Sequence, residues 1–473
     1  MSLPRPSLLF AGIFAATLLL RLCHSSVLWV EEAYPTAAAL EMLRGQALYR
    51  DIWFDKPPLF PLLYLLWGAA QGPLLRLAGA FFVTLAAASA WFATRRLAGP
   101  REAALAAALL AFFLNFGVPS AVMALTPDLL LIPLHLAAIG FAASGHPLAA
   151  GLAAGLGLLL NTKSALILAA CALWQWRNFH RLIAGFLAPQ ILAAAVLLST
   201  GALGAYWQQV WQWGAVYSRE TFVAQPWLEG LRRTLNWTGM HATLALGAAI
   251  CFWRNRNAQL IPLAGWLLIS LLGVALGARF FPRYYFHLLP AATVIAALGL
   301  ARLSPRALLA SLLLLTIPFL RYTPRYADLA LDALHIRPST WRDLALERDA
   351  RAAAALLAPL QRPTDTLLVW GYRPELFTFT GLPAATPFLD SQPLSGVLAD
   401  RHLTDSTVTY PELAIRHRTE LGRAPRPTII IDGLGLLNPR LAFFNLSGFS
   451  AWAADYEIIG KTETCIIYRL RQP

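Results

Sequence analysis

The chain has 473 residues, of which 58% are hydrophobic and 13% charged, and its mean hydropathy is +0.55. A soluble protein of this length would carry about twice that share of charge, so a purely soluble fold is excluded. The net charge of +13 does not indicate nucleic-acid binding, because many arginines flank apolar runs and no basic stripe with interleaved aromatic residues occurs. The four cysteines are scattered and give neither a disulfide framework nor a metal cluster.

Apolar runs of span length recur along the first 320 residues and predict a multi-pass α-helical membrane protein. The first run is interpreted as an uncleaved span, because no small-residue cleavage site follows it. Eleven spans are predicted, at 7–23, 76–95, 102–118, 128–143, 147–161, 163–176, 181–200, 236–254, 259–278, 287–301 and 305–320.

The shorter apolar run 59–70 decides the topology. It is short for a span, and it is interpreted as a re-entrant or interfacial helix. Cytoplasmic links are usually the basic ones, and leaving this run out places the basic links on the same side as the N-terminus. These links are Arg95/Arg96/Arg101, Arg177/Arg181, Arg254/Arg256 and Arg302/Arg306, which join Arg5. The N-terminus is therefore predicted in the cytoplasm and the C-terminus outside.

This topology divides the chain into a membrane module, 1–320, and an outer soluble domain, 321–473. The soluble domain holds 16 of the 25 acidic residues and no span-length apolar run. Its pattern predicts a small α/β domain. The predicted strands are Leu367–Trp370, Thr428–Ile431, Tyr456–Ile459 and Cys465–Tyr468, and the predicted helices are 341–360 and 411–421. On the same outer side we expect the loop 24–75, the turn with Asp128, the link 161–163, the loop 201–235 and the turn 279–286.

The first outer loop concentrates acidic residues. Five of the nine carboxylates of the first 320 residues lie there, at Glu31, Glu32, Glu41, Asp51 and Asp55. Acidic side chains beside a bilayer are costly and usually serve a task. Helical spacing of apolar residues predicts an amphipathic interfacial helix over 31–44, with both glutamates in its first turn. Either glutamate is a candidate general base, and simple helix-end electrostatics is the alternative.

The segment Asp55-Lys56-Pro57-Pro58 follows in the same loop. Two prolines stiffen the backbone, so that Lys56 is presented beside the membrane, where a lysine can bind phosphate as a point charge. The alternative is that Lys56 pairs with Asp55 or with lipid headgroups. Asp51 and Asp55 could also hold a divalent cation, but no spacing specifies such a site, so a metal is left open.

Further charged residues are predicted on the outer side. Asp128 follows Thr126-Pro127 at an ordinary helix start, and its placement near the acidic loop makes it a candidate. Lys163, Arg279 and Arg283 run against the usual charge rule and are candidate phosphate ligands, with interfacial anchoring as the alternative. The Trp-rich stretch 206–213 most often indicates an aromatic belt. His24, His241 and His287 are weaker candidate ligands, because a lone histidine is more often only a satisfied polar residue.

Together these residues resemble the GT-C glycosyltransferases, in the branch that uses polyprenyl-phosphate sugars, which includes protein O-mannosyltransferases and the lipid A aminoarabinose transferase. The resemblance covers residues 1–320. It rests on an acidic pair with a nearby tyrosine, a Lys-Pro-Pro block, an acid opening a later span, a lysine link and an Arg-Tyr pair. These matches are Glu31, Glu32, Tyr34, Leu43-Arg44-Gly45, Tyr49-Arg50-Asp51, Lys56-Pro57-Pro58, Pro127-Asp128, Asn161–Lys163, Arg283-Tyr284 and Pro290. The family pair is usually Asp-Glu, so the Glu-Glu pair here leaves open which glutamate acts.

The resemblance implies transfer of a sugar from a polyprenyl-phosphate donor to an acceptor glycan, lipid or protein on the outer face, with inversion at the anomeric carbon. It implies catalytic roles for Glu31, Glu32 and Asp128 and phosphate contacts for Lys56, Arg283, Lys163 and Arg279. Other pocket residues would be Tyr34, Asp51, Asp55 and Tyr284. Composition and resemblance together place the chain in a bacterial plasma membrane.

Two other functional classes remain. A transporter or lipid flippase is the first alternative, but the sequence shows no internal repeat, and its ionisable residues cluster on one side of the membrane. An assembly protein whose outer domain binds partners is the second, and it leaves the outer-loop carboxylates and Lys56 unexplained.

Overall fold

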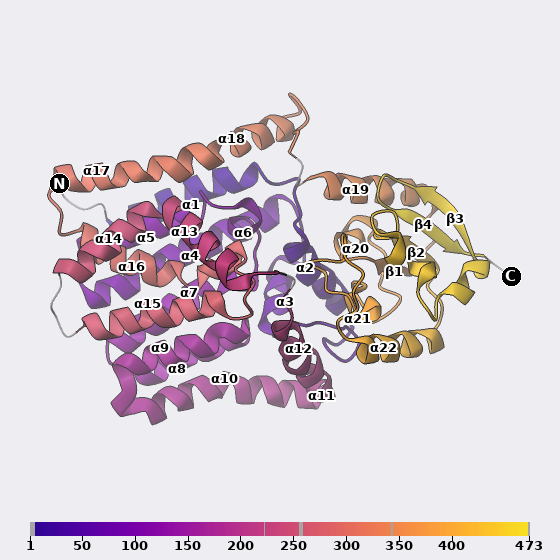
Figure 1. Cartoon of the computed structure of the whole chain (residues 1–473), viewed down its shortest axis with the longest axis horizontal. Helices are drawn as coiled ribbons and strands as arrows, with labels where there is room; N and C mark the ends of the chain where they lie inside the picture. Colours follow the sequence, from indigo (N-terminus) through magenta and orange to yellow (C-terminus); the bar gives the residue numbers. More distant parts are fainter. Residues whose placement is uncertain (1–4, 222, 255–258, 342–343, 472–473) are drawn as a thin grey trace.

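The computed structural model describes residues 5–221, 223–254, 259–341 and 344–471. Within these ranges a large helical bundle is joined at one end to a smaller C-terminal domain that contains a sheet (Figure 1). Arg256, which belongs to one of the predicted basic links, lies outside the described residues.

Each predicted span coincides with helical structure. The bundle helices are α1 (Pro6–Leu22), α4 (Pro73–Leu97), α5 (Pro100–Phe113), α7 (Pro127–Ala143), α8 (Pro147–Leu158), α9 (Ala165–Gln175), α10 (Phe179–Ser199), α14 (Ala242–Arg254), α15 (Leu260–Ala275), α16 (Leu289–Leu300) and α17 (Pro305–Leu312). Many begin with proline in the first turn, where its missing N–H costs nothing.

The described part of the chain has three helical stretches long and apolar enough to cross a membrane, 73–97, 162–199 and 305–333. Six further apolar helices are shorter. The structure thus agrees with a membrane protein, whereas eleven spans and their orientation stay predictions.

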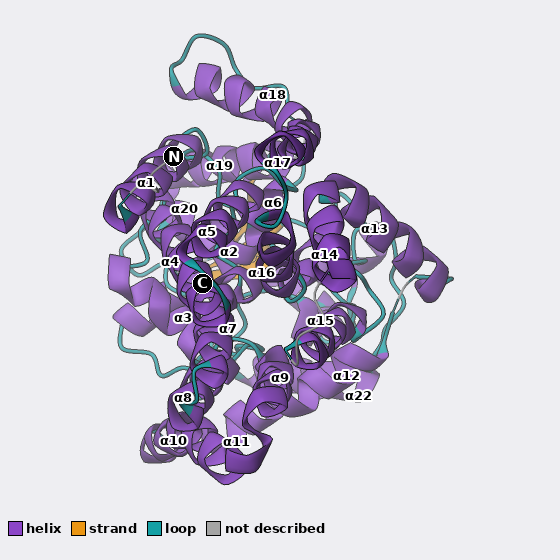
Figure 2. Cartoon of the chain, turned by 90° about the vertical axis from the view of Figure 1, so that its left-hand side faces the viewer, coloured by secondary structure: helices purple, strands orange, loops and turns teal. Residues whose placement is uncertain are grey.

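The bundle is packed around α16, whose residues are all buried. Seen from the end opposite the C-terminal domain, α5, α7, α14 and α15 lie around it (Figure 2). Glycines permit close crossings: a Cβ on Gly299 of α16 would lie 2.0 Å from the carbonyl oxygen of Gly247 in α14. Small residues at helix crossings are typical of membrane bundles, where packing rather than hydrophobicity drives association.

Three segments differ from the sequence-based expectation, whereas the run 59–70 is a short helix, as predicted. The helix α2 (Val30–Leu43) forms where the interfacial helix was predicted, but most of it is buried under the C-terminal domain, so it is not an exposed amphipathic surface (Figure 1). The run 59–70 contains α3 (Leu59–Tyr64) and a 3-10 turn, Leu65–Trp67. A further helix, α13 (Pro226–Met240), precedes α14. Finally, α18 (Thr316–Ala333) continues past the predicted domain boundary at 320.

Most of the described residues of the loop 201–235 are helical, and the loop is hydrogen-bonded to the first outer loop. It contains α11 (Leu203–Tyr206), a π-helical segment (Trp207–Gln212) and α12 (Trp213–Arg219). Gln209 is buried, its Oε1 accepts the Phe54 N–H at 2.9 Å and its Nε2 donates to the Tyr49 carbonyl at 2.8 Å. Two loops far apart in sequence are thereby held against each other. The short α6 (Pro119–Val122) and the 3-10 segment Pro282–Phe286 lie in two other connections.

The C-terminal domain contains a four-stranded sheet in the order β1-β2-β4-β3. Its strands are β1 (Leu367–Trp370), β2 (Ile429–Asp432), β3 (Tyr456–Lys461) and β4 (Ile466–Leu470). The four predicted strands are thus confirmed to within a few residues. Leu367 pairs with Ile429 in the parallel β1–β2 ladder, and the remaining ladders are antiparallel. Both β1 and β2 are buried throughout, as their continuous apolar sequence requires.

Helices surround this sheet and attach it to the bundle. They are α19 (Ala345–Leu357), α20 (Glu375–Thr380), α21 (Gln392–Ser395) and α22 (Pro411–Arg423), of which α19 and α22 were predicted; residues 342–343 of the predicted first helix lie outside the described residues. The first outer loop forms the attachment: the Leu28 N–H donates to Glu347 at 2.9 Å, and the Trp53 N–H donates to the Pro387 carbonyl at 2.8 Å.

Candidate functional site

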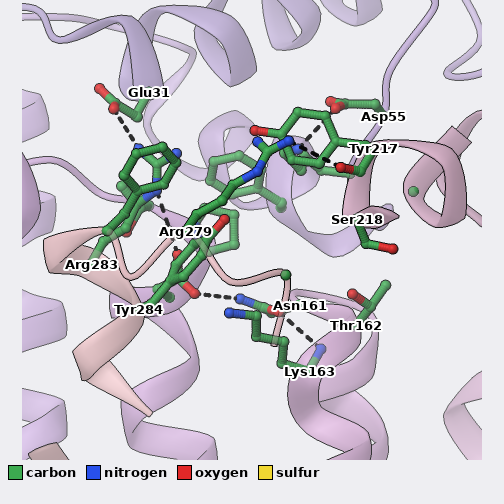
Figure 3. A pocket seen from close by; sticks show the side chains of 18 of the residues that line it. Glu31, Asp55, Asn161, Thr162, Lys163, Tyr217, Ser218, Arg279, Arg283 and Tyr284 are labelled. Carbon is green, nitrogen blue, oxygen red and sulfur yellow. Dashed lines mark hydrogen bonds and ion pairs between the residues drawn. The ribbon is translucent and has the colours of Figure 1, made fainter. Parts of the chain in front are cut away.

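A cavity of about 1000 Å³ lies where the bundle meets the C-terminal domain. Its wall comes from the start of α2, the Lys-Pro-Pro segment, the start of α7, residues 160–166, α12, residues 276–284 and two loops of the C-terminal domain. This volume is at the upper end of the range of small-molecule sites. Most of the predicted site residues line it, and Figure 3 shows several of them pointing toward one another.

The two adjacent glutamates of α2 have different surroundings. Glu31 lines the cavity, and its Oε1 lies 2.6 Å from Nη1 of Arg283. Glu32 is fully buried, with Oε2 2.6 Å from Arg76 Nη2 and Oε1 accepting the Leu125 N–H at 3.0 Å. Successive helical residues point about 100° apart, which separates the pair in this way. Of the two, only Glu31 is placed to meet a substrate in this cavity.

Arg283 lies within reach of two carboxylates, and its contact with Glu31 is drawn in Figure 3. Besides Glu31, its Nε lies 3.9 Å from Oδ2 of Asp128. The other oxygen of Asp128 faces Asn161 Nδ2 at 2.9 Å and His287 Nε2 at 3.3 Å. Asn161 Oδ1 accepts the Lys163 N–H at 3.0 Å, so its amide nitrogen is the group turned to Asp128. Asp128 is therefore held as a hydrogen-bond acceptor beside Arg283.

Lys56 also lines the cavity. Its Nζ lies 2.8 Å from Asp55 Oδ2, and the side chain is 39% exposed, which leaves it accessible to a ligand. The segment is held in place by Tyr49, whose hydroxyl donates to the Lys56 carbonyl at 2.7 Å. Tyr34 lines the same wall and stacks on Phe54, with ring centroids 4.7 Å apart.

Lys163 and Arg279 also line the cavity, but both have strong protein contacts. The Lys163 Nζ donates to the Gly273 carbonyl at 2.9 Å and lies 3.5 Å from the centre of the Tyr284 ring. Arg279 pairs with Asp400 of the C-terminal domain at 2.8 Å and donates to the carbonyls of Glu220 and Tyr217 at 2.7 and 3.0 Å. Arg279 therefore fastens the C-terminal domain to the rim of the cavity.

Asp51 does not line the cavity. It pairs with Arg50 at 2.8 Å and accepts the Ala47 N–H at 2.9 Å, within the first outer loop. The hydrogen bond from Arg50 holds the pKa of the Asp51 carboxyl below its usual value. Its role is to shape the turn that precedes Lys56.

The C-terminal domain contributes residues that sequence reasoning did not single out. Tyr372, Gln392 and Asp400 line the cavity, and Tyr372 lies two residues after the end of β1. Nearby, burial raises the pKa of the Asp390 carboxyl to about 7, and the Asp55 carboxylate adds to the shift. No local sequence signal marked these residues, because their loops meet the bundle only through the tertiary fold. Asn161, His287 and Asp128 were each noted in the sequence, but the contacts of the first two with Asp128 were not predicted.

The described residues contain no group of three or more His, Cys, Asp or Glu side chains that could hold a metal ion. Glu31, Asp55 and Asp400 each pair with a cationic side chain instead. These pairings do not fit the oxygen cage that a divalent cation takes, so no step is assigned to a metal.

Comparison with protein-family models and with curated protein sequences gives no match. Comparison with solved structures does. The chain is similar to ArnT from Cupriavidus metallidurans bound to undecaprenyl phosphate, with a TM-score of 0.64 and 15% identity over 98% of this chain and 97% of that one. The apo form of the same protein gives a TM-score of 0.60 at 15% identity, with the same coverage.

A third similar structure is the archaeal oligosaccharyltransferase AglB from Archaeoglobus fulgidus, in complex with an inhibitory peptide and a dolichol-phosphate. Its TM-score is 0.50 at 11% identity, over 94% of this chain and 71% of that one. The chain has the GT-C fold. The predicted helical GT-C-like fold with a C-terminal domain is thereby confirmed over nearly the whole chain, whereas the eleven spans and the outer location of that domain stay predictions.

Proposed function

We propose that this chain is a membrane glycosyltransferase that moves a sugar from a polyprenyl-phosphate donor to an acceptor hydroxyl on the outer face of a bacterial plasma membrane. The observation that carries the proposal is the arrangement in one cavity of Glu31, Arg283 and Lys56, a base and two cations. The two structural neighbours whose structures contain undecaprenyl phosphate or dolichol-phosphate support the choice of donor.

The donor phosphate would bind between Lys56 and Arg283. Both cations are paired in the ligand-free cavity, Lys56 with Asp55 and Arg283 with Glu31. The Glu31 carboxylate accepts from Nη1 of Arg283, so a phosphate that binds this same donor competes with Glu31 for the guanidinium. Phosphate binding therefore releases Glu31, so that the base becomes available only when the donor is present.

The chemical step follows from this exchange. The acceptor hydroxyl gives its proton to Glu31 while its oxygen forms a bond to the anomeric carbon. The bond from that carbon to the phosphate oxygen breaks, and the phosphate keeps the electron pair. Lys56 and Arg283 stabilise the extra negative charge on the leaving polyprenyl phosphate. Attack opposite the leaving group inverts the anomeric carbon. Asp128 holds Arg283 in place and is a positioning residue in this scheme.

The test is transfer of label from a panel of radiolabelled polyprenyl-phosphate sugars by membranes that contain the wild type, Lys56→Met or Arg283→Met. We expect the wild type to transfer one of the sugars and both variants to lose transfer while remaining folded. Variants that transfer as well as the wild type would contradict the assigned phosphate site. Movement of the labelled lipid between leaflets without any transfer would favour a flippase instead.

A further inference from the structure

A second, much smaller cavity lies inside the bundle, next to the cation–carboxylate cluster. It has a volume of about 10 Å³ and is lined by His135, Ser270 and His287, with apolar residues from α9 closing it. That volume is close to the minimum of about 10–15 Å³ that holds one water molecule. Three polar side chains on its wall meet the need of a buried water for two to four partners.

His135 is an unusual residue for its position. It lies on α7 seven residues after Asp128, two helical turns further along the same face and about 10 Å deeper into the bundle. It is 3% exposed. Ionisable side chains at such depth are costly and face the interior of a bundle, where they are usually functional. His135 has no part in the proposed transfer, so its presence needs a separate explanation.

The hydrogen bonds fix which nitrogen of each histidine carries a proton. Trp266 Nε1 can only donate, and it lies 2.8 Å from His135 Nε2, so this nitrogen must be an acceptor. A neutral His135 then carries its proton on Nδ1. At the other end, Asp128 accepts through the oxygen that faces His287 Nε2, which must therefore carry a proton, so a neutral His287 has a free acceptor at Nδ1.

We propose that Trp266, His135, one buried water and His287 form a single chain of hydrogen bonds that ends on Asp128, with every donor pointing toward the carboxylate. Trp266 donates to His135, the His135 Nδ1–H donates to the water, the water donates to His287 Nδ1, and the His287 Nε2–H donates to Asp128. Ser270, four residues after Trp266 on the same face of α15, supplies the third contact of the water.

Through these hydrogen bonds, His287 and His135 act as positioning residues for Asp128. Hydrogen bonds in one direction polarise one another and strengthen the last of them. Together with Asn161, the chain gives Asp128 Oδ1 two donors and leaves Oδ2 for Arg283. Asp128 is thus kept as an anion that holds Arg283 in the catalytic cavity. This role of Asp128 rests on the proposed function, whereas the direction of the hydrogen bonds does not.

The helix packing leaves little freedom at this point. A Cβ on Gly273 of α15 would lie 3.3 Å from Cβ of His287, so the glycine allows the histidine to sit against the helix. The carbonyl of the same glycine accepts from Lys163. The His287 ring is therefore held by packing as well as by Asp128.

The test is ¹⁵N NMR of the histidine side chains in the full-length protein, solubilised in detergent at neutral pH. The chain has nine histidines, and His135→Gln and His287→Gln assign the two signals by their loss. We expect the proton of His135 on Nδ1, which is the rarer form in solution, and that of His287 on Nε2. A proton on Nε2 of His135, or a doubly protonated His287, would overturn the proposal.

Kinetics supply a second test that a merely structural role would not satisfy. Gln at position 287 can place an N–H near the original Nε2, whereas Leu cannot. We expect His287→Leu to lower transfer at least tenfold and His287→Gln to keep it within about threefold, with equal thermal stability. Equal losses in both variants would contradict the role in holding Asp128. If neither the wild type nor the variants transfer sugar, the proposed function fails. The NMR result still decides whether the proposed hydrogen bonds between His135, the water and His287 are present.

Discussion

Two ion pairs formed by neighbouring residues of α2 differ in their exposure to solvent. Glu31 and Arg283 line the large cavity, and their side chains are 23% and 29% exposed. Glu32 and Arg76 are both 0% exposed. A partly solvated pair is weak and can exchange partners, whereas a dry pair cannot be separated without leaving a charge buried. The first pair is suited to binding and the second to holding structure.

The surroundings of the dry pair agree with that role. Arg76 also donates to the carbonyls of Met123 and Val27, at 3.3 and 3.2 Å. Arg21, likewise buried, donates to the Met123 and Val122 carbonyls at 2.7 and 2.5 Å. These bonds, together with that from Leu125 to Glu32, fix the segment that leads into α7. The buried pair of Glu32 and Arg76 therefore helps to fix the position of Asp128, although neither residue lines the cavity.

The largest expected effect is that of Glu31→Gln on transfer. The substitution keeps the shape of the side chain and removes the base, whose contribution is typically 10²–10⁴-fold. We predict a loss of transfer in that range with thermal unfolding close to that of the wild type. Initial rates with a saturating polyprenyl-phosphate sugar measure the effect. Full activity in the variant would show that another group accepts the proton.

Glu32→Gln should have the opposite profile. Removing the buried charge leaves Arg76 without its partner, which typically costs about 3–5 kcal/mol. We predict a clearly lower unfolding temperature in detergent and a poor yield of folded protein. The molecules that do fold should transfer sugar at a rate much nearer the wild type than Glu31→Gln. A stable but inactive variant would reverse the assignment of the two glutamates.

Asp390, which lies near the junction of the helical bundle and the C-terminal domain, should make the stability of the fold depend on pH. Its folded pKa of about 7 lies above the unfolded value of 3.8, so the folded chain binds the extra proton. Stability from this group is therefore complete below about pH 4 and is lost as the pH rises through 7. Relative to Asp390→Asn, the wild type should lose up to about 1.4 kcal/mol per pH unit in that window. Unfolding of both proteins from pH 5 to 8 measures the difference, and parallel curves would contradict it.

Asp51→Asn provides the smallest expected effect and a matched control for Glu31. It removes a carboxylate from the same outer loop, but one that faces Arg50 rather than the cavity. Exposed pairs of this kind contribute about 0–1 kcal/mol, and the Asn oxygen can still accept the Ala47 N–H. We predict transfer within about twofold of the wild type. A large loss would show that charge in the loop matters, rather than its position in the cavity.

The helical membrane module could be predicted from the length of the apolar runs, and the strands of the C-terminal domain from short apolar runs. The GT-C fold was implied by the resemblance of the motifs and their order. The different roles of Glu31 and Glu32 could not be predicted, because both residues occupy the first turn of one helix and only the rotation of that helix separates them. The same limit applies to α2 as a whole. Its sequence suited a membrane interface, and it is buried because the C-terminal domain covers it.

The cavity residues that come from the C-terminal domain could not be predicted either. Tyr372 and Asp400 lie in a domain whose sequence carried no sign of a site, and their placement depends on the contacts that dock it, such as Arg279 with Asp400. The sequence predicted Lys56, Asp128 and Arg283 on one side of the membrane, and the structure brings the three to one cavity. It could not show that Arg283 lies within reach of the two carboxylates.

The exchange of Glu31 for phosphate on Arg283 is the centre of the account, and binding of polyprenyl phosphate to Glu31→Gln tests it most directly. Titration of purified wild type, Glu31→Gln and Asp51→Asn, followed by fluorescence of the cavity tryptophans Trp211 and Trp213, gives the three affinities. We predict that Glu31→Gln binds the lipid phosphate several-fold more tightly than the other two proteins, although its rate of transfer is about 10²–10⁴-fold lower. Unchanged or weaker binding in that variant would contradict the competition between Glu31 and phosphate.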